Sequence, residues 1–285
     1  MTDDPAADAA ELWSGIEGDH WVRNAERHDT MLAPFADALF ERTGLVPGDR
    51  VLDVGCGCGA TSLIAARAVG EDGDVLGLDL SPQMLEVARA RASAQALANV
   101  TFEVADAQRC ELEPAGRDVV LSRFGVMFFA DPAEAFANLA STLRPGGRLV
   151  FCCWQPMLSN DWLLAPGLAA AAHVPLPDLG PAGAPGPFSL DDPARLHTLL
   201  DGAGFEHAVF DELRPDISVG GGGSVDEILD YLVTSGSGRA LLADADDAAR
   251  QLAIEAVRRV LADHHDGERV LFGSAAWFVV ATRAS

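Results

Sequence analysis

The sequence contains no lysine, so all 20 of its basic residues are arginines, and 43 acidic residues outnumber them. The formal net charge is therefore -23. A surface this acidic repels phosphate backbones and anionic lipid headgroups, which argues against nucleic acid and membrane surfaces as partners. We expect a small-molecule substrate instead, and a chain that acts as a monomer or a homodimer.

Long apolar runs and a basic leader are also missing. No stretch reaches the about 18 uninterrupted apolar residues of a membrane span, and the segment MTDDPAADAAELW is acidic where a secretory signal would be basic. We therefore expect a cytoplasmic protein. The five cysteines, at positions 56, 58, 110, 152 and 153, include no C-x-x-C pair, so we expect reduced thiols and no metal site.

What the sequence does contain is a regular alternation of short apolar segments and helical patterns. Strands are predicted at 50–54, 74–80, 99–106, 117–124 and 148–155. Helices are predicted at 60–69, 81–97 and 131–143, the second with Ser81 as N-cap and Pro82 in its first turn. Apolar strands that alternate with helices are typical of a parallel sheet covered on both faces, so the sequence predicts an α/β fold.

Helical patterns flank this alternation on both sides. Residues 11–45 carry spaced apolar and aromatic side chains and predict two or three helices. After residue 155 we expect helices, a proline- and glycine-rich loop at 175–188, a strand over 206–219, a flexible connector in VGGGGS and a final strand at 274–284.

This organisation predicts three parts of one domain. They are an N-terminal helical lid (1–45), a cofactor-binding core (46–155) and the remainder of the sheet (156–285), with inserted cap helices at about 156–190 and 219–270.

The segment VLDVGCGCGA, residues 51–60, runs from a buried strand into three glycines spaced two apart. Gly55, Gly57 and Gly59 have no Cβ, so the backbone can turn sharply and lie against a bound molecule. Such a turn after the first strand of a parallel sheet usually holds a nucleotide cofactor. The letters GCGCGA also fit the dinucleotide pattern, so the loop alone does not separate NAD from another adenosine cofactor.

Three acids narrow that choice. Asp79 ends the second strand 20 residues after Gly59, where a carboxylate can accept hydrogen bonds from both hydroxyls of a ribose. Asp106 ends the third strand, and from there its carboxylate could accept a hydrogen bond from the amino group of an adenine. Asp53 lies two residues before the glycines, and a cationic amino-acid group explains an acid there better than a pyrophosphate does.

With these residues, the segment 50–155 resembles the class I S-adenosylmethionine-dependent methyltransferases, in particular the ubiquinone/menaquinone-methyltransferase-like branch. VLDVGCGCG is similar to their first motif, LGLDLS to the second, VADA to the third and LRPGG to the turn before the fifth strand. The resemblance implies a Rossmann-like, seven-stranded, mostly parallel sheet with an antiparallel last strand and a helical lid. It also implies S-adenosyl-L-methionine as cofactor and S-adenosyl-L-homocysteine as product.

The resemblance also implies which residues bind the cofactor. They are Asp53, Gly55, Cys56, Gly57, Gly59, Asp79, Leu80, Met84, Asp106, Ala107 and Ser122. Asp53 and the glycines would surround the methionine part, Asp79 would bind the ribose, and Asp106 with Ala107 would recognise the adenine edge.

Methyl transfer requires alignment and exclusion of water, with a general base only where the acceptor is a hydroxyl of high pKa. We predict that the segment ELWSGIEGDHWVRNAERHDTML folds over the cofactor site, with His20 as the leading base. Arg123 is the second catalytic candidate, because it could orient a carboxylate or phenolate acceptor, or merely pair with an acid. The substrate-pocket candidates, each of which could instead pack in the core, are Trp13, Trp21, His28, Trp154, Asn160, Trp162 and Tyr231.

We therefore predict a methyltransferase that acts on a small aromatic or isoprenoid-like metabolite of specialised metabolism. One alternative is an NAD-dependent oxidoreductase on the same glycine loop, against which stand Asp53, Asp106 and the lack of any lysine for a Tyr-x-x-x-Lys pair. The other is a non-catalytic, methyltransferase-like binding protein.

Overall fold

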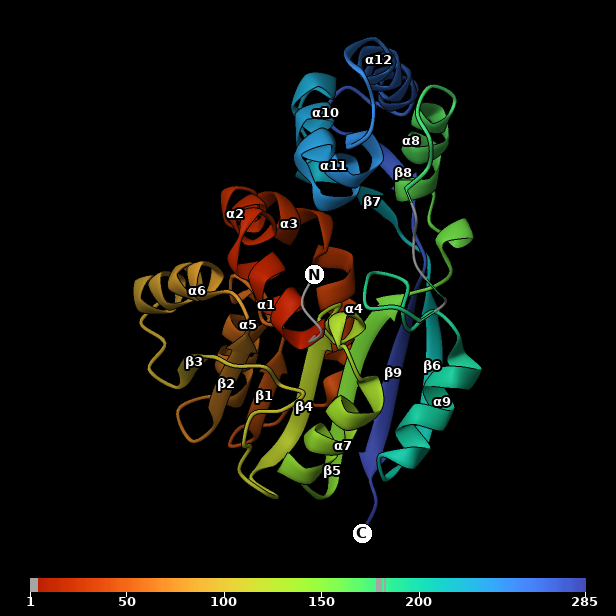
Figure 1. The fold of residues 1–285 in the computed structure, drawn as a ribbon. Coiled ribbons are helices and arrows are strands. Elements are labelled where there is room, and N and C mark those ends of the chain that lie inside the picture. The colour runs from red at the N-terminus through yellow and green to blue at the C-terminus, as the bar shows by residue number, and fades with distance from the viewer. Residues whose placement is uncertain (1–4, 178–180, 182) are drawn as a thin grey trace.

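A seven-stranded sheet, in the order β3-β2-β1-β4-β5-β9-β6, is the centre of the computed structural model, which describes residues 5–177, 181 and 183–285 (Figure 1). Its strands are β1 (Arg50–Val54), β2 (Asp74–Asp79), β3 (Val100–Val104), β4 (Arg117–Arg123), β5 (Leu143–Trp154), β6 (Phe205–Leu213) and β9 (Ala276–Arg283). β1 to β5 pair in parallel, and β9 runs antiparallel to both β5 and β6. The predicted α/β fold, with a mostly parallel sheet and an antiparallel last strand, is confirmed.

Helices cover both faces of the sheet, which is why the central strands are apolar throughout. One face carries α4 (Ala33–Thr43), α5 (Ala60–Val69) and α6 (Pro82–Ala94), and the other carries α7 (Pro132–Thr142) and α9 (Pro193–Gly202) (Figure 1). Side chains from both layers, such as Phe35 and Phe136, are fully buried against strand residues such as Leu52 and Phe151. The two layers together form the core.

Local signals set the helix boundaries as expected. The Ser81 hydroxyl accepts a hydrogen bond from the Met84 amide, and Pro82 occupies the first turn of α6. Asp131 and Asp192 cap α7 and α9 in the same way. These caps satisfy amides that the first helical turn leaves without partners.

β5 is longer than predicted. It begins at Leu143, although the sequence predicted a turn before residue 148. Leu143 pairs with Arg117, the chain then shifts register around Gly146, which has φ 75°, and pairing resumes between Arg148 and Val119. The glycine-containing turn is thus a bulge within the strand.

Between Pro5 and Thr43 the chain forms four helices, where two or three were expected. Before α4 come α1 (Pro5–Ser14), α2 (Ile16–Arg23) and α3 (Ala25–Met31), because the backbone leaves helical geometry at Gly15, Asn24 and Leu32. α1, α2 and α3 lie at the carboxyl ends of the parallel strands, whereas α4 packs on the face of the sheet (Figure 1). Residues 1–4 of the expected lid lie outside the described residues.

A second group of helices lies at the same end of the sheet (Figure 1). It contains α8 (Asp161–Ala171), α10 (Val225–Thr234), α11 (Gly236–Leu242) and α12 (Asp247–Asp263), with a two-stranded sheet of β7 (Asp216–Ser218) and β8 (Leu271–Gly273). The short 3-10 turns are η1 (Val126–Phe128), η2 (Met157–Ser159) and η3 (Val219–Gly221). No helix in the described part of the chain is long and apolar enough to cross a membrane.

Two predictions in this region were wrong. The segment 206–219 is not one strand, because the chain changes sheets at Arg214 and Pro215 between β6 and β7. Positions 178–180 and 182 of the expected loop at 175–188 lie outside the described residues.

The second wrong prediction in this region concerns the glycine run at 220–223. It is a packed turn rather than the flexible connector that the sequence predicted. Gly220 to Gly223 all have positive φ, from 62° to 111°. A Cβ on Gly221 would lie 2.7 Å from the Cα atom of Arg27 on α3. The Arg27 guanidinium donates from Nη1 to the carbonyls of Gly220 (2.7 Å) and Gly222 (2.9 Å). The glycines therefore let α3 approach the C-terminal half closely.

Candidate active site

The glycine loop joins β1 to α5 at the carboxyl ends of the strands. Gly55, Gly57 and Gly59 have φ of 66°, 53° and 84°, in the left-handed region that glycine tolerates best. A Cβ would lie 2.8 Å from the Gly125 Cα at Gly55, and equally close to the Ala88 Cβ at Gly59. These two glycines thus bring the loop against its neighbours, whereas at Gly57 the backbone angle alone favours glycine.

Asp53, at the end of β1, is completely buried beneath this loop. Its Oδ2 accepts hydrogen bonds from the hydroxyls of Thr61 (2.7 Å) and Ser62 (2.6 Å) at the start of α5. Its Oδ1 has no hydrogen-bond partner among the residues that the structure describes. Burial raises the pKa of Asp53 to about 6. A buried oxygen without a partner costs about 1–3 kcal/mol, which a ligand with N–H donors would recover.

Asp79, at the end of β2, ties the loop to the next helix. Its Oδ2 accepts from the Gly57 amide (2.7 Å) and its Oδ1 from the Ser81 amide (2.9 Å). Burial raises the pKa of this carboxyl as well. Because each carboxylate oxygen can accept two hydrogen bonds, Asp79 keeps acceptor capacity for a ligand.

Residues expected near an adenine lie along the ends of β2 and β3. Asp106 is half-buried and accepts the Gln108 amide at 3.0 Å, and Ala107 beside it is buried. Leu80 is half-buried directly after β2. Met84 is buried with Ala25 and Cys58, and this small cluster packs against Trp13 and Trp21. The lid thus contacts the elements on which the expected cofactor site is built.

Ser122 and Cys56 have structural contacts at the other end of the loop. The Ser122 hydroxyl donates to the Val54 carbonyl (2.7 Å) and accepts from the Gly125 amide (3.2 Å). Both residues are buried, and burial raises the pKa of the Cys56 thiol well above its ordinary value. Ser122 therefore fixes the turn after β4 against β1, and Cys56 is a neutral thiol.

Arg123 pairs with an acid of the lid. Its Nη2 lies 3.8 Å from the Oδ1 of Asp29 on α3, and Asp29 also bonds Arg91 at 2.9 Å. Burial lowers the pKa of the Arg123 guanidinium. Arg123, Arg91 and Asp29 line a cavity of about 280 Å³ between α3, α4, α5 and α6. Of the two roles predicted for Arg123, pairing with an acid is the one visible here.

Aromatic residues of the lid meet Tyr231 of α10. The Trp21 ring stacks on His28 with centroids 3.8 Å apart, and the rings of His20 and His28 lie 5.8 Å apart. Tyr231 contacts both histidines, with centroids at 5.3 Å and 5.5 Å. Trp13 packs edge-on against Trp21 at 6.0 Å. The structure thus brings five predicted site residues together from two distant parts of the chain, and we call them the lid cluster.

Sequence reasoning missed three neighbours of the lid cluster. Phe128 of η1 packs against Trp13 at 5.0 Å. The Nδ1 of His20 lies 3.4 Å from both the Asn24 amide nitrogen and the Thr234 hydroxyl. The aromatic letters of GVMFFADP after the fourth strand could have indicated Phe128, whereas no local pattern marks Asn24 or Thr234.

Both lid histidines are buried and each has one ring nitrogen without a hydrogen-bond partner in the described part of the chain, Nε2 of His20 and Nδ1 of His28. Burial lowers the pKa of His20, and lowers that of His28 to about 3. Both rings are therefore neutral at pH 7. Among residues 5–177, 181 and 183–285, no group of histidines, cysteines and acids is arranged to hold a metal ion.

Three other pocket candidates form a separate packing group at the end of β5. Trp154 stacks on Phe124 with centroids 4.1 Å apart. The Asn160 amide donates to the carbonyls of Gln155 (3.0 Å) and Pro156 (3.3 Å). Its Oδ1 accepts from the Trp162 indole (3.1 Å) and from the Ala275 amide (2.9 Å). All hydrogen bonds of Asn160 are used within the protein, which gives it a structural role, and its pocket role stays a prediction.

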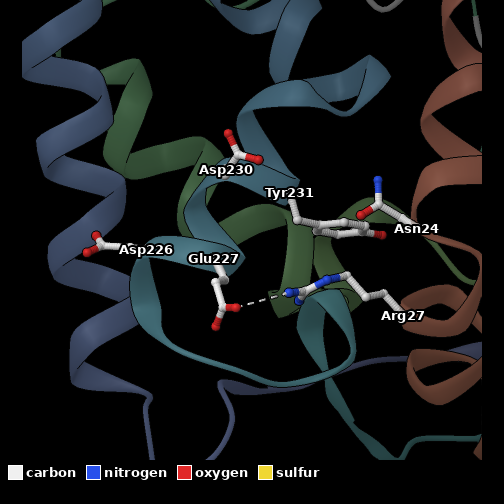
Figure 2. A pocket seen from close by; sticks show the side chains of 6 residues that line it. All are labelled: Asn24, Arg27, Asp226, Glu227, Asp230 and Tyr231. Atoms are coloured by element: carbon white, nitrogen blue, oxygen red, sulfur yellow. Dashed lines mark ion pairs between the residues drawn. The ribbon is translucent and has the colours of Figure 1, made fainter.

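A pocket of about 350 Å³ opens beside Tyr231 at the junction of lid and cap. Asn24 and Arg27 line it from the lid, and Asp226, Glu227, Asp230 and Tyr231 from α10. In Figure 2 the Tyr231 ring lies beside Asn24 and Arg27, and the Arg27 Nη2 points to the Glu227 Oε1 at 3.8 Å. Three acids and one arginine thus line an opening next to the lid cluster, and of these acids Glu227 is the one that pairs with Arg27.

Comparison with known proteins supports a family for the core. Residues 45–171 match a family model described as a methyltransferase domain. The chain is 38% identical over 118 residues to aklanonic acid methyltransferase DauC of Streptomyces sp. (strain C5), covering 41% of this chain and 54% of that protein. It is 31% identical over 144 residues to demethylmenaquinone methyltransferase of Lactococcus lactis subsp. lactis (strain IL1403), covering 49% and 56%. The chain therefore spans about half the length of these curated relatives.

Solved structures agree with the fold. Phosphoethanolamine N-methyltransferase 2 of Haemonchus contortus has a TM-score of 0.54 at 21% identity, covering 88% of this chain and 53% of that one. At this identity the likeness concerns the fold alone, which is the arrangement described above.

Proposed function

We propose that this chain, whose residues 45–171 form a methyltransferase domain of the class I S-adenosylmethionine-dependent type, transfers a methyl group to a small-molecule acceptor. The observation that carries the proposal is the buried Asp53 Oδ1 beneath the glycine loop, without a partner among the described residues. A cofactor with an ammonium group supplies the donor that this oxygen needs. A pyrophosphate would instead bring negative charge toward a buried carboxylate.

The residues present fit such a cofactor. Asp53 would hold the ammonium group directly or through water, and Asp79 would accept hydrogen bonds from the ribose hydroxyls. Asp106 and Ala107 would face the adenine edge, with Leu80 and Met84 packed nearby. When bound, the cofactor supplies a methyl group on a positively charged sulfur, already activated for displacement. The protein then has to align the acceptor and exclude water, for which α1, α2 and α3 are suitably located.

The proposed acceptor is an aromatic or isoprenoid-like metabolite of specialised metabolism. The aromatic side chains of the lid cluster, Trp13, Trp21 and Tyr231, suit a planar apolar molecule. Two curated relatives are named for small-molecule acceptors, aklanonic acid and demethylmenaquinone. The likeness to the aklanonic acid enzyme is our reason for including specialised metabolism.

Calorimetric titration of S-adenosylhomocysteine into the wild type and Asp79→Asn tests the cofactor. We expect binding near micromolar, weakened at least tenfold by the substitution, which corresponds to about 1.4 kcal/mol. Asp72→Asn is the matched control, because Asp72 is exposed in the turn that precedes β2. Heat from NADH and none from S-adenosylhomocysteine would contradict the proposal and favour an oxidoreductase.

A further inference from the structure

Arg123, at the end of β4, is a nearly buried cation. Its side chain is 11% exposed, and Asp29 is its ion-pair partner in the described part of the chain, with Nη2 3.8 Å from Oδ1. That separation is too long for a hydrogen bond. The five N–H donors of the guanidinium therefore have no acceptor among the described residues. Because a buried charge without hydrogen bonds is costly, a ligand that accepts from Arg123 would be favoured.

Arg123 lines the cavity of about 280 Å³ between α3, α4, α5 and α6. Two further arginines line it, Arg67 from α5 and Arg91 from α6. The acids in its lining are Asp29 and Asp37. The cavity thus has one more arginine than acid, in a chain whose formal net charge is -23. A cationic hollow in such an acidic surface attracts anions to one place.

The other two arginines also keep donors for a ligand. Arg91 uses Nη1, which donates to the Cys58 carbonyl at 3.2 Å and lies 2.9 Å from the Asp29 Oδ2. Arg67 uses Nη2, which bonds the Gln95 side chain. Within the described residues, the remaining nitrogens of both side chains have no partner. Since Asp29 already places a carboxylate beside two of the three arginines, a carboxylate is a group that they accommodate.

Apolar residues form another part of the lining. They are Ala33 and Ala36 of α4, and Ala60, Leu63 and Ile64 of α5. Pockets for drug-sized ligands measure about 300–1,000 Å³, so this cavity suits a smaller molecule. Such a molecule needs a compact apolar body for these side chains and one anionic group for the arginines.

We propose that this cavity is a binding site for a small organic carboxylate, whose anionic group bonds Arg123 and whose apolar body packs on Leu63 and Ile64. A carboxylate matches the planar fork of a guanidinium, and charge-assisted hydrogen bonds of this kind are the strong ones. Its single charge also balances the one excess arginine. A phosphate monoester carries nearly two charges at pH 7 and would leave the cavity negative. The inference does not depend on methyl transfer.

The cavity is separate from the predicted cofactor site. None of the residues predicted to bind the cofactor lines it within the described part of the chain. Ala60 nonetheless follows the glycine loop directly, and Asp29 belongs to the lid helix α3. We therefore expect the carboxylate to bind beside S-adenosylhomocysteine rather than in its place, at a point where the lid meets the core.

Calorimetric titration of three cyclohexane derivatives into the cofactor-free protein tests the ligand class. The probes are cyclohexanecarboxylate, its neutral analogue cyclohexanecarboxamide and the more highly charged cyclohexyl phosphate. None of them has an aromatic ring to stack in the lid cluster. We expect the carboxylate to bind at least about tenfold more tightly than the other two, and less tightly as the salt concentration is raised. Equal binding of carboxylate and amide, or tighter binding of the phosphate, would overturn the assignment.

Variants locate the carboxylate in the cavity. Arg123→Gln should weaken binding of cyclohexanecarboxylate about tenfold or more, and Arg67→Gln about threefold, because each removes one cation from the lining. Arg89→Gln is the matched control, since Arg89 is an exposed arginine of α6 that bonds the Phe102 carbonyl and does not line the cavity. Unchanged affinity in both cavity variants would refute the site. If Arg123→Gln does not fold, the affinity of Arg67→Gln decides.

Titration at saturating S-adenosylhomocysteine separates this site from the cofactor site. The affinity for cyclohexanecarboxylate should stay within about threefold of its value in the cofactor-free protein. If S-adenosylhomocysteine abolishes the binding, the arginines serve the cofactor's own carboxylate, and the separate site is refuted. A protein that binds cyclohexanecarboxylate but no S-adenosylhomocysteine contradicts the proposed function and leaves this inference intact.

Discussion

Ionisation of Asp53 opposes folding of the cofactor-free chain, and this predicts an unusual pH dependence. Burial raises the pKa of Asp53 from 3.8 to about 6 in the folded state. The folded protein therefore binds a proton at a pH where the unfolded chain does not. Above pH 6 the folded state bears the cost of a buried charge, and that cost is relieved as the pH falls from 6 toward 3.8.

The size of the effect follows from these two pKa values. Proton linkage gives a gain of about 1.3 kcal/mol in the free energy of unfolding between pH 7 and pH 5 for this one group. In a chain of this size that corresponds to a rise in Tm of about 2 °C. Asp53→Asn removes the titration and keeps an oxygen that can accept from Thr61 and Ser62. The other titrating groups then cancel in the difference between the two proteins.

The assay is urea unfolding of the cofactor-free wild type and Asp53→Asn at pH 7, 6 and 5. We expect the free energy of unfolding of the wild type to gain about 1.3 kcal/mol on the variant between pH 7 and pH 5. A difference that stays constant would refute the buried, ionisable Asp53. With S-adenosylhomocysteine, the wild type should lose affinity below pH 6 because protonation removes the charge that holds the ammonium, and Asp53→Asn should not.

Two further predictions concern residues outside the chemistry. Asn160→Ala removes the amide partner of four residues, and two of the lost hydrogen bonds, those to Gln155 and Ala275, are buried, so the free energy of unfolding should fall by about 3 kcal/mol. Calorimetry should find its affinity for S-adenosylhomocysteine unchanged, and unaltered stability would contradict the structural role. Arg27→Ala removes the bonds from α3 to the carbonyls of Gly220 and Gly222. Limited proteolysis within residues 5–31 should accelerate about tenfold, whereas Arg269→Ala, an exposed control, should be cleaved as the wild type is.

Most of the sheet could be predicted because its signals are local. Each of β1 to β4 is a short apolar run followed by a turn, and α6 and α7 begin at a capping residue followed by proline. The segments that were predicted wrongly are those whose structure depends on contacts with residues distant in the chain. β5 starts early because Leu143 finds Arg117, and the glycine run at 220–223 is ordered because Arg27 bonds it.

The candidate site divides in the same way. The sequence by itself determined the glycine loop and the positions of Asp53, Asp79 and Asp106, because the carboxyl ends of parallel strands gather at one edge of a sheet. The cofactor roles of these residues stay predictions that the titration above will decide.

Only the tertiary structure decided what surrounds the two lid histidines. The Tyr231 ring contacts His20 and His28, although α10 lies some 200 residues further along the chain. Its hydroxyl also contacts the sulfur of Met31 on α3. Asn160, attractive in the sequence, is fully occupied by hydrogen bonds within the protein. The His20 Nδ1 has its near neighbours on two helices, Asn24 after α2 and Thr234 at the end of α10. Such partners are set by packing between helices, which residue spacing along one strand or helix does not encode.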